Sequence, residues 1–204
     1  MASIYDIKPA FQNLLRPLTR ALATAGVTAN QVTVLAAILS CAVGACIALR
    51  PEARWPLLVL PAFLFLRMAL NAIDGMLARE HGMKSRLGAV LNEVGDVVAD
   101  SALYLPLALV PGFSLWLMVT VTLLAVISEM TGVVAIQIGA TRRYDGPMGK
   151  SDRAFVFGLI ALLLGLGVSP EPWLLWVQSA VVALLLLTIF NRARRALAEK
   201  PAPQ

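Results

Sequence analysis

Charged side chains are scarce in this chain: Asp, Glu, Lys and Arg make up 14% of its 204 residues, whereas 59% are hydrophobic. An ordinary soluble domain has about 25% charged residues, so the composition excludes a soluble globular enzyme. A chain this apolar collapses, which also excludes disorder and a coiled coil. Two cysteines, Cys41 and Cys46, are too few for a disulfide scaffold, and their spacing puts them on different helix faces. The remaining class is a single compact membrane domain.

Uncharged runs predict where the chain crosses a membrane, because one crossing takes about 20 mostly apolar residues. Four runs lack charged residues, at 32–49, 101–128, 154–170 and 172–191. The second run is too long for one crossing, and the turn signal Pro111-Gly112 divides it between two helices at about 88–110 and 113–140. A further span, from Trp55 to about Ala78, contains charged residues. We therefore expect an all-α polytopic membrane protein with six transmembrane helices.

The N-terminal segment has apolar residues at helical spacing, separated by polar ones. The apolar positions are Ile4, Ile7, Phe11, Leu14, Leu15 and Leu18. This pattern predicts an amphipathic helix in the membrane interface, interrupted by Pro9 and Pro17, and the segment lacks the apolar core of a cleavable signal peptide. We expect one domain over residues 1–204, comprising this interfacial segment (1–27), the six-helix bundle (28–196) and a tail (197–204).

Basic residues indicate the orientation of the bundle. Fourteen Lys and Arg fall before residue 28, in the second and fourth connections and at the C-terminus, whereas the opposite side has two, Arg50 and Arg54. The positive-inside rule then places both termini in the cytoplasm. We expect a multi-pass protein of the inner (cytoplasmic) membrane. Its net charge of +5 suits anionic lipids or phosphorylated substrates at the cytoplasmic face, without nucleic acid.

Polar residues recur inside two consecutive spans, where each is costly unless it has a partner or water. The two sets are Arg67, Asn71 and Asp74 on one helix and Asn92, Asp96 and Asp100 on the next. Their spacing of three or four residues puts each set on one stripe. A short connection makes the helices antiparallel neighbours, and counting from it puts Asp74 level with Asn92, Asn71 with Asp96 and Arg67 with Asp100.

Oxygen ligands without Cys or His suit a hard cation, Mg²⁺ or Mn²⁺, that also holds phosphate oxygens. The alternative is hydrogen bonding that only holds the helices together. Residues that leave room for a ligand and supply a charge favour the metal site, and these are Gly75, Ala78, Arg79 and Gly88.

The same residues carry a family resemblance. Asn71-x-x-Asp74-Gly75-x-x-Ala78-Arg79, followed after eight residues by Gly88-x-x-x-Asn92-x-x-x-Asp96, resembles the signature of the CDP-alcohol phosphatidyltransferases. That signature reads Asp-x-x-Asp-Gly-x-x-Ala-Arg and then Gly-x-x-x-Asp-x-x-x-Asp. The segment Thr28-Ala29-Asn30-Gln31-Val32-Thr33 resembles the family's Thr-Pro-Asn-x-x-Thr segment, and the family also has six helices with cytoplasmic termini.

The resemblance implies transfer of a phosphatidyl or related phosphoalcohol group from a CDP-activated donor, such as CDP-diacylglycerol, to a small alcohol, with release of CMP. It implies that the metal ligands are Asp74, Asp96, Asn71 and Asn92. Asp96 would also be the base for the acceptor hydroxyl. The nucleotide-binding positions would be Asn30, Asp74, Gly75, Ala78, Arg79 and Gly88. The family further implies a homodimer, which the small residues Gly132, Ala135 and Gly139 would allow.

Two of the four metal positions depart from the signature, because Asn71 and Asn92 replace Asp. Asn keeps a carbonyl oxygen but loses the charge, so the affinity for a second ion should fall most. Three outcomes are open: one metal suffices, Asp100 or Glu93 compensates, or the family reaction is lost. We favour the transferase, and the alternative is a catalytically silent relative that binds CDP-lipid or scaffolds a partner enzyme.

We favour a structural role for three further charged residues at membrane depth, Arg67, Asp100 and Glu129. A buried Arg67 needs a counter-ion, and Asp100 or Glu129 would supply it. Glu93 points away from the Asn92 stripe and receives no assignment.

The fourth connection is the candidate acceptor or headgroup site, because it combines basic residues with glycine and proline that can wrap a phosphate. Lys150 and Arg153 rank ahead of Arg142 and Arg143. The alternative is that these cations only reflect topology. The C-terminal cluster of Arg192, Arg194 and Arg195 is interpreted as a membrane-facing stop signal.

Overall fold

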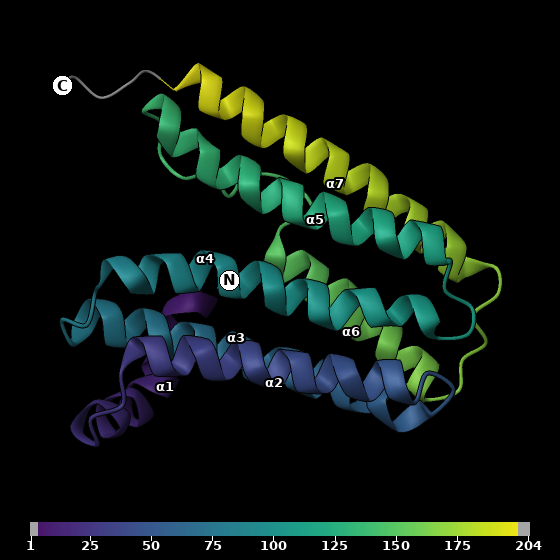
Figure 1. Cartoon of the computed structure of the whole chain (residues 1–204), viewed down its shortest axis with the longest axis horizontal. Coiled ribbons are helices and arrows are strands. Elements are labelled where there is room, and N and C mark those ends of the chain that lie inside the picture. The colour runs from purple at the N-terminus through teal and green to yellow at the C-terminus, as the bar shows by residue number, and fades with distance from the viewer. Residues whose placement is uncertain (1–3, 200–204) are drawn as a thin grey trace.

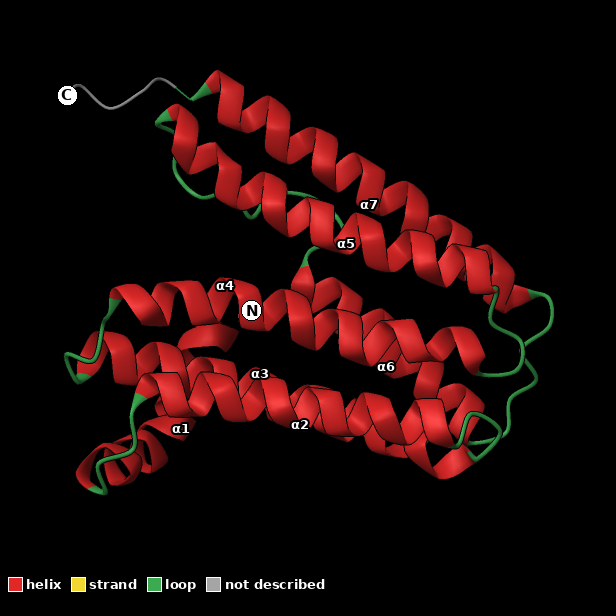
Figure 2. Ribbon diagram, viewed as in Figure 1, coloured by secondary structure: helices red, strands yellow, loops and turns green. Residues whose placement is uncertain are grey.

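The computed structural model describes residues 4–199. These residues form seven α-helices and two 3₁₀ helices, with no strand among them (Figure 2). The α-helices are α1 (Ile4–Thr24), α2 (Ala29–Leu49), α3 (Arg54–Glu80), α4 (Arg86–Tyr104), α5 (Leu115–Val134), α6 (Lys150–Gly165) and α7 (Trp173–Ala198). The 3₁₀ helices η1 (Leu105–Leu109) and η2 (Ala135–Ile138) follow α4 and α5 directly. The predicted all-α class is confirmed.

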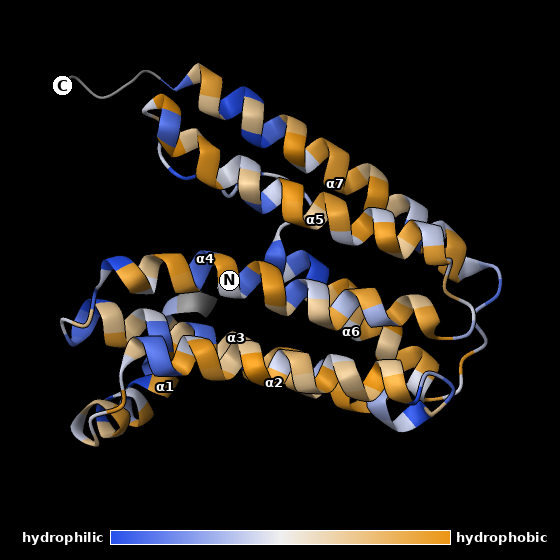
Figure 3. Cartoon of the chain, in the orientation of Figure 1, coloured by the Kyte–Doolittle hydropathy of each residue, from blue (hydrophilic) through white to orange (hydrophobic). Residues whose placement is uncertain are grey.

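Four segments are long and apolar enough to cross a membrane: α2, α3, α5 with η2, and α7. Hydrophobic residues dominate these helices, and hydrophilic residues gather toward their ends (Figure 3). The chain is therefore a multi-pass membrane protein. The count of six spans stays a prediction, because α4 contains Glu93, Asp96 and Asp100 and α6 has only 16 residues.

Local chemistry explains where the helices begin. Thr28 opens α2 with a capping box, in which its backbone N donates to Gln31 Oε1 at 2.9 Å and its Oγ1 accepts from Gln31 N at 3.3 Å. Ser85 opens α4, since its Oγ accepts from Gly88 N at 2.9 Å. The predicted turn at Pro111-Gly112 is confirmed, with Gly112 at φ 92°, a conformation that glycine adopts at little cost.

The helices pack in pairs, and α2 and α3 take part in most of them. α2 lies against both α3 and α4, α3 lies against α6, and α5 lies against α7 (Figure 1). Gly44 permits the α2–α4 contact, because a Cβ there would lie 1.8 Å from the carbonyl oxygen of Ala102. α3 and α4 are not among the closely packed pairs. The expectation that they are direct neighbours is therefore wrong over most of their length, and α2 is the helix that contacts both.

α1 is a continuous helix that contains Pro9 and Pro17. The predicted interruptions are wrong, because each proline removes one backbone hydrogen bond while the rest of the ladder holds. α1 is held to α3 by Arg16, whose Nη2 lies 2.9 Å from Glu80 Oε1. Leu14 and Leu18 are 75% and 50% exposed, as suits a helix facing lipid. The side chains of Ile4 and Ile7 lie outside the described residues.

Candidate active site

Asp74 is a buried carboxylate on α3. It is 6% exposed, and its Oδ2 accepts a hydrogen bond from Thr33 Oγ1 on α2 at 2.9 Å. Among the described side chains, which begin at residue 9, no Lys, Arg or His lies at salt-bridge distance from it. A buried carboxylate that has a hydroxyl partner but no salt bridge is costly. Burial of the Asp74 carboxylate therefore costs free energy that a bound cation would offset.

Asp96 on α4 is partly exposed and faces two cations. Its Oδ1 accepts a hydrogen bond from Lys150 Nζ at 2.5 Å and lies 3.5 Å from Arg67 Nη2. Arg67 also donates to the backbone oxygen of Asp96 at 3.3 Å. Lys150 is the first residue of α6, so three helices meet at this carboxylate.

The four predicted metal positions provide two carboxylates and two amides. Asn71 is half-buried, and Asn92 is exposed. Within the described residues, no group of three or more His, Cys, Asp or Glu could hold a metal ion. The donor set of Asp74, Asp96 and two amide oxygens suits one hard cation, and it does not suit a cluster of two ions held by four carboxylates.

The predicted nucleotide-binding positions lie at the starts of α2 and α4 and near the end of α3. Asn30 Nδ2 lies 3.4 Å from Ser85 Oγ, and a Cβ on Gly88 would lie 2.6 Å from Asn30 Oδ1. A Cβ on Gly75 would lie 3.0 Å from Arg79 Nη2. Asn30 and Gly88 are therefore brought together from distant parts of the sequence. Both glycines lie where a side chain would displace a neighbouring polar group.

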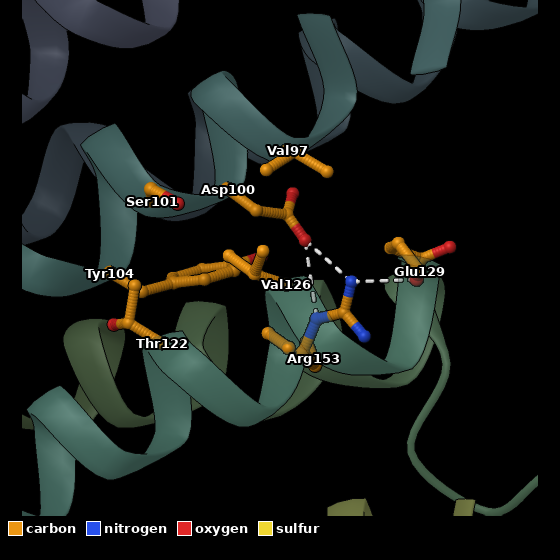
Figure 4. Close-up of a pocket in the computed structure, with 9 residues that line it drawn as sticks. Val97, Asp100, Ser101, Tyr104, Thr122, Val126, Glu129 and Arg153 are labelled. Atoms are coloured by element: carbon orange, nitrogen blue, oxygen red, sulfur yellow. Dashed lines mark hydrogen bonds and ion pairs between the residues drawn. The ribbon is translucent and has the colours of Figure 1, made fainter. Parts of the chain in front are cut away.

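An ion-pair network occupies the membrane-depth region beyond Asp96. Arg67 Nη1 donates to Asp100 Oδ1 at 2.5 Å. Arg153 Nη2 donates to Asp100 Oδ2 at 2.7 Å and to Glu129 Oε1 at 3.0 Å (Figure 4). Glu129 also lies 3.3 Å from Arg192 Nη1. Of the two counter-ions expected for Arg67, Asp100 or Glu129, the structure pairs it with Asp100. Glu129 neutralises arginines of α6 and α7 and makes no ion pair with Arg67 within the described chain.

Two interpretations made from the sequence are wrong, because the ion-pair network buries Arg153 and Arg192. Arg153 is 0% exposed, so its guanidinium does not face an acceptor or headgroup. Arg192 is 1% exposed and donates to the carbonyl oxygen of Ser128 at 2.5 Å, so it is not a membrane-facing stop signal. Asp100 and Glu129 at membrane depth need more than one counter-ion. These two carboxylates could have indicated from the sequence that arginines other than Arg67 are buried.

The connection between η2 and α6 is tied down by charge. Arg142 Nη2 donates to Glu93 Oε2 at 2.6 Å, and its Nε and Nη1 are buried and find no partner within residues 4–199. Arg143 donates to Asp145 Oδ2 at 2.8 Å and to Glu199 Oε2 at 2.6 Å. Burial raises the pKa of Asp145, but hydrogen bonds from Arg143 and Arg195 outweigh it and hold the pKa below its ordinary value.

Small residues expected at a dimer contact pack within the chain. A Cβ on Gly132 would lie 2.5 Å from the carbonyl oxygen of Arg143. Ala135 is 2% exposed and belongs to a small core cluster with Ala140 and Ala196. These two positions therefore provide no support for an interface between copies. Gly139 ends η2 in the left-handed conformation, with φ 79°.

Comparison with known proteins relates this arrangement to a family. Inner membrane protein YnbA of Escherichia coli (strain K12) is 45% identical over 199 residues, covering 96% of each chain. Phosphatidylinositol phosphate synthase of Mycolicibacterium smegmatis is 30% identical over 206 residues, covering 94% of this chain and 88% of that protein. The crystal structure of the Mycobacterium tuberculosis phosphatidylinositol phosphate synthase with CDP-DAG bound has a TM-score of 0.75 at 20% identity, covering 92% and 98% of the two chains.

The family model for CDP-alcohol phosphatidyltransferase matches residues 26–193, which span both halves of the signature and the start of α2. The resemblance seen in the sequence is confirmed. The chain belongs to the CDP-alcohol phosphatidyltransferase family, a class of membrane transferases.

Proposed function

We propose that this protein transfers a phosphatidyl, or related phosphoalcohol, group from a CDP-activated donor such as CDP-diacylglycerol to a small alcohol, releasing CMP. The observation that carries this proposal is the buried carboxylate of Asp74, which makes no salt bridge among the described side chains and shares a signature with Asp96. The donor is supported by the M. tuberculosis relative, whose structure has CDP-DAG bound. This reaction belongs to phospholipid biosynthesis.

The metal site would comprise Asp74 and Asp96 with the amide oxygens of Asn71 and Asn92. A bound Mg²⁺ or Mn²⁺ supplies positive charge that stabilises the negative charge developing on the departing CMP. Manganese is present in a second structure of the M. tuberculosis relative. The buried position of Asp74 strengthens its attraction for a cation relative to an exposed carboxylate.

Asp96 would remove the proton from the acceptor hydroxyl. The acceptor oxygen then forms a bond to the phosphorus of the donor, and the bond from that phosphorus to CMP breaks. Its partly exposed position at the meeting of three helices leaves Asp96 accessible to an acceptor.

The nucleotide would lie against the start of α4 and the end of α3. Asn30 offers an amide, Arg79 a cation, and Gly75, Ala78 and Gly88 leave the backbone open to close approach. An acceptor phosphate or headgroup would lie near Lys150 and Arg142, because two donor nitrogens of Arg142, Nε and Nη1, have no partner among the described side chains. Arg143 would hold the connection in place.

We place the site at the cytoplasmic face of the inner membrane, with both termini in the cytoplasm. The charge asymmetry of the sequence supports this orientation, and the E. coli relative is named as an inner membrane protein. A homodimer rests on the family resemblance alone, and chemical crosslinking in native membranes tests it.

The transferase is tested by CMP release from CDP-diacylglycerol in detergent micelles, with Mg²⁺ or Mn²⁺ and a panel of small alcohols. We expect release only with both the metal and one class of acceptor. Release that persists in excess chelator would contradict the proposal. Each alcohol is run against a sample lacking acceptor, so that donor hydrolysis is separated from transfer.

The second candidate is a catalytically silent relative that binds CDP-lipid or scaffolds a partner enzyme. Asn71 and Asn92 in the signature favour it, because they remove charge from the metal site. Tight binding of CDP-diacylglycerol that is independent of metal, with no CMP released for any acceptor, would support this candidate.

A further inference from the structure

Two positions of the family signature have no negative charge in this chain, and the structure places a positive charge against a third position, Asp96. Asn71 and Asn92 stand where the signature has Asp, and Lys150 Nζ lies 2.5 Å from Asp96 Oδ1. We propose that the Lys150 ammonium takes the place of one of two cations, so that this site holds a single divalent ion. Lys150 is then a positioning residue built into the reaction centre, an inference that rests on the proposed function.

The position of Lys150 is fixed by the local structure around it. It is the first residue of α6, where the backbone N of Gly149 donates to Asp152 Oδ2 at 2.9 Å. One turn later, Arg153 is fully buried and donates to Asp100 at 2.7 Å. The start of α6 is therefore anchored on both sides of Lys150. Its side chain is only 29% exposed, so it does not extend freely into solvent.

The charges around Asp96 favour one ion over two. Its Oδ1 faces both Lys150 and Arg67, at 2.5 Å and 3.5 Å. Its Oδ2 has no ion pair among the described side chains and could bind a metal. Asp74 likewise makes no salt bridge, and its Oδ2 accepts a hydrogen bond only from Thr33 among the described side chains. Like charges repel strongly where solvent screening is weak. A second divalent ion on the Oδ1 side would meet two fixed cations without the carboxylates that the signature provides at 71 and 92.

Counting bound Mn²⁺ tests this inference without measuring turnover. The full-length protein in detergent is titrated with Mn²⁺, and free Mn²⁺ is followed by its electron paramagnetic resonance signal. We expect one ion per chain. Lys150→Met should tighten Mn²⁺ binding by about tenfold, because a repelling charge leaves and Asp96 gains a free oxygen. A lysine that only binds the acceptor or anchors α6 would not produce this gain.

Two variants serve as matched controls. Lys150→Arg keeps the charge and should bind Mn²⁺ as the original chain does. Lys84→Met removes the same charge from an exposed residue that makes no ion pair in the described chain, and should leave Mn²⁺ affinity unchanged. Size-exclusion chromatography and thermal unfolding check that each variant is folded.

Restoring the signature charges completes the test. Asn71→Asp and Asn92→Asp combined with Lys150→Met should bind two Mn²⁺ per chain. Two ions bound by the original chain, or no tightening in a folded Lys150→Met, would overturn the inference. The proposed function can fail separately from this inference. If the chain binds one ion and Lys150→Met tightens that binding, yet no CMP is released with any donor or acceptor, the inference holds and the transferase proposal is wrong.

Discussion

Arg67 on α3 and Asp100 on α4 form a buried ion pair, with 2.5 Å between Nη1 and Oδ1. The two side chains are only 3% and 7% exposed, so water solvates neither charge well. Asp100 also accepts from Arg153 and thereby connects α3, α4 and α6. This carboxylate holds together the helices that carry the candidate active site.

Removing the charge of Asp100 should therefore destabilise the fold. Asp100→Asn leaves Arg67 and Arg153 without their shared counter-ion, and breaking one partner of a buried pair costs about 3 to 5 kcal/mol. We expect a clear fall in the thermal unfolding temperature, with activity lost in proportion to the unfolded fraction. Loss of CMP release at unchanged stability would contradict a structural role. Glu52→Gln, at an exposed position, is the control.

Close approach of α2 and α4 depends on Gly44. In Gly44→Ala the new methyl group would lie 1.8 Å from the carbonyl oxygen of Ala102, a backbone atom that cannot rotate away. Overpacking of this kind costs about 1 to 3 kcal/mol or more. Gly95→Ala on α4 is the matched control, since its nearest contact is 3.7 Å from Thr33. Equal unfolding temperatures for the two variants would show that the helices do not approach this closely.

Gly88 should affect ligand binding more than stability. A Cβ at this position would lie 2.6 Å from Asn30 Oδ1 and 2.9 Å from Ser85 Oγ, which are side-chain ends that can shift. Gly88→Ala should weaken CDP-lipid binding by about tenfold, while the disturbed cap of α4 costs only about 1 kcal/mol. A fluorescent CDP-lipid and a thermal unfolding scan measure the two effects. Unchanged affinity would remove Gly88 from the nucleotide site.

Acid should release the C-terminal end of α7 from the connection that precedes α6. The backbone N–H of Thr141 donates to Glu199 at 3.0 Å and lowers the pKa of that carboxyl below its ordinary 4.5. A lowered pKa contributes stability that is present above about pH 4.5 and is lost as the pH falls through the folded-state pKa. Exchange of the Thr141 amide should therefore accelerate on acidification. In Glu199→Gln this acceleration should be absent.

The sequence predicted features that depend on short-range periodicity. Counting residues outward from the connection between α3 and α4 predicted that Arg67 and Asp100 lie at the same depth, because helical rise is constant. Bilayer thickness and the Pro111-Gly112 turn likewise located the helices. The separation of α3 from α4 could not be predicted this way, because short-range periodicity does not show that α2 packs against both helices.

Long-range pairings of cations were beyond the sequence pattern. Lys150 and Asp96 are 54 residues apart, and no periodicity connects them. Arg153 and Arg192 lie in segments that are basic for topological reasons, so their burial is invisible until α5, α6 and α7 are placed. Counting the acidic residues at membrane depth would have indicated that Arg67 alone could not neutralise them.

The most direct test measures CMP and the new phospholipid together in the original chain and in Asp96→Asn. With CDP-diacylglycerol, Mg²⁺ and the acceptor that the panel identifies, both products should form in equal amounts. Removing the base should lower both by about 100-fold or more, with unchanged thermal unfolding. Equal rates in a folded Asp96→Asn, or CMP formed without phospholipid, would contradict phosphatidyl transfer through Asp96.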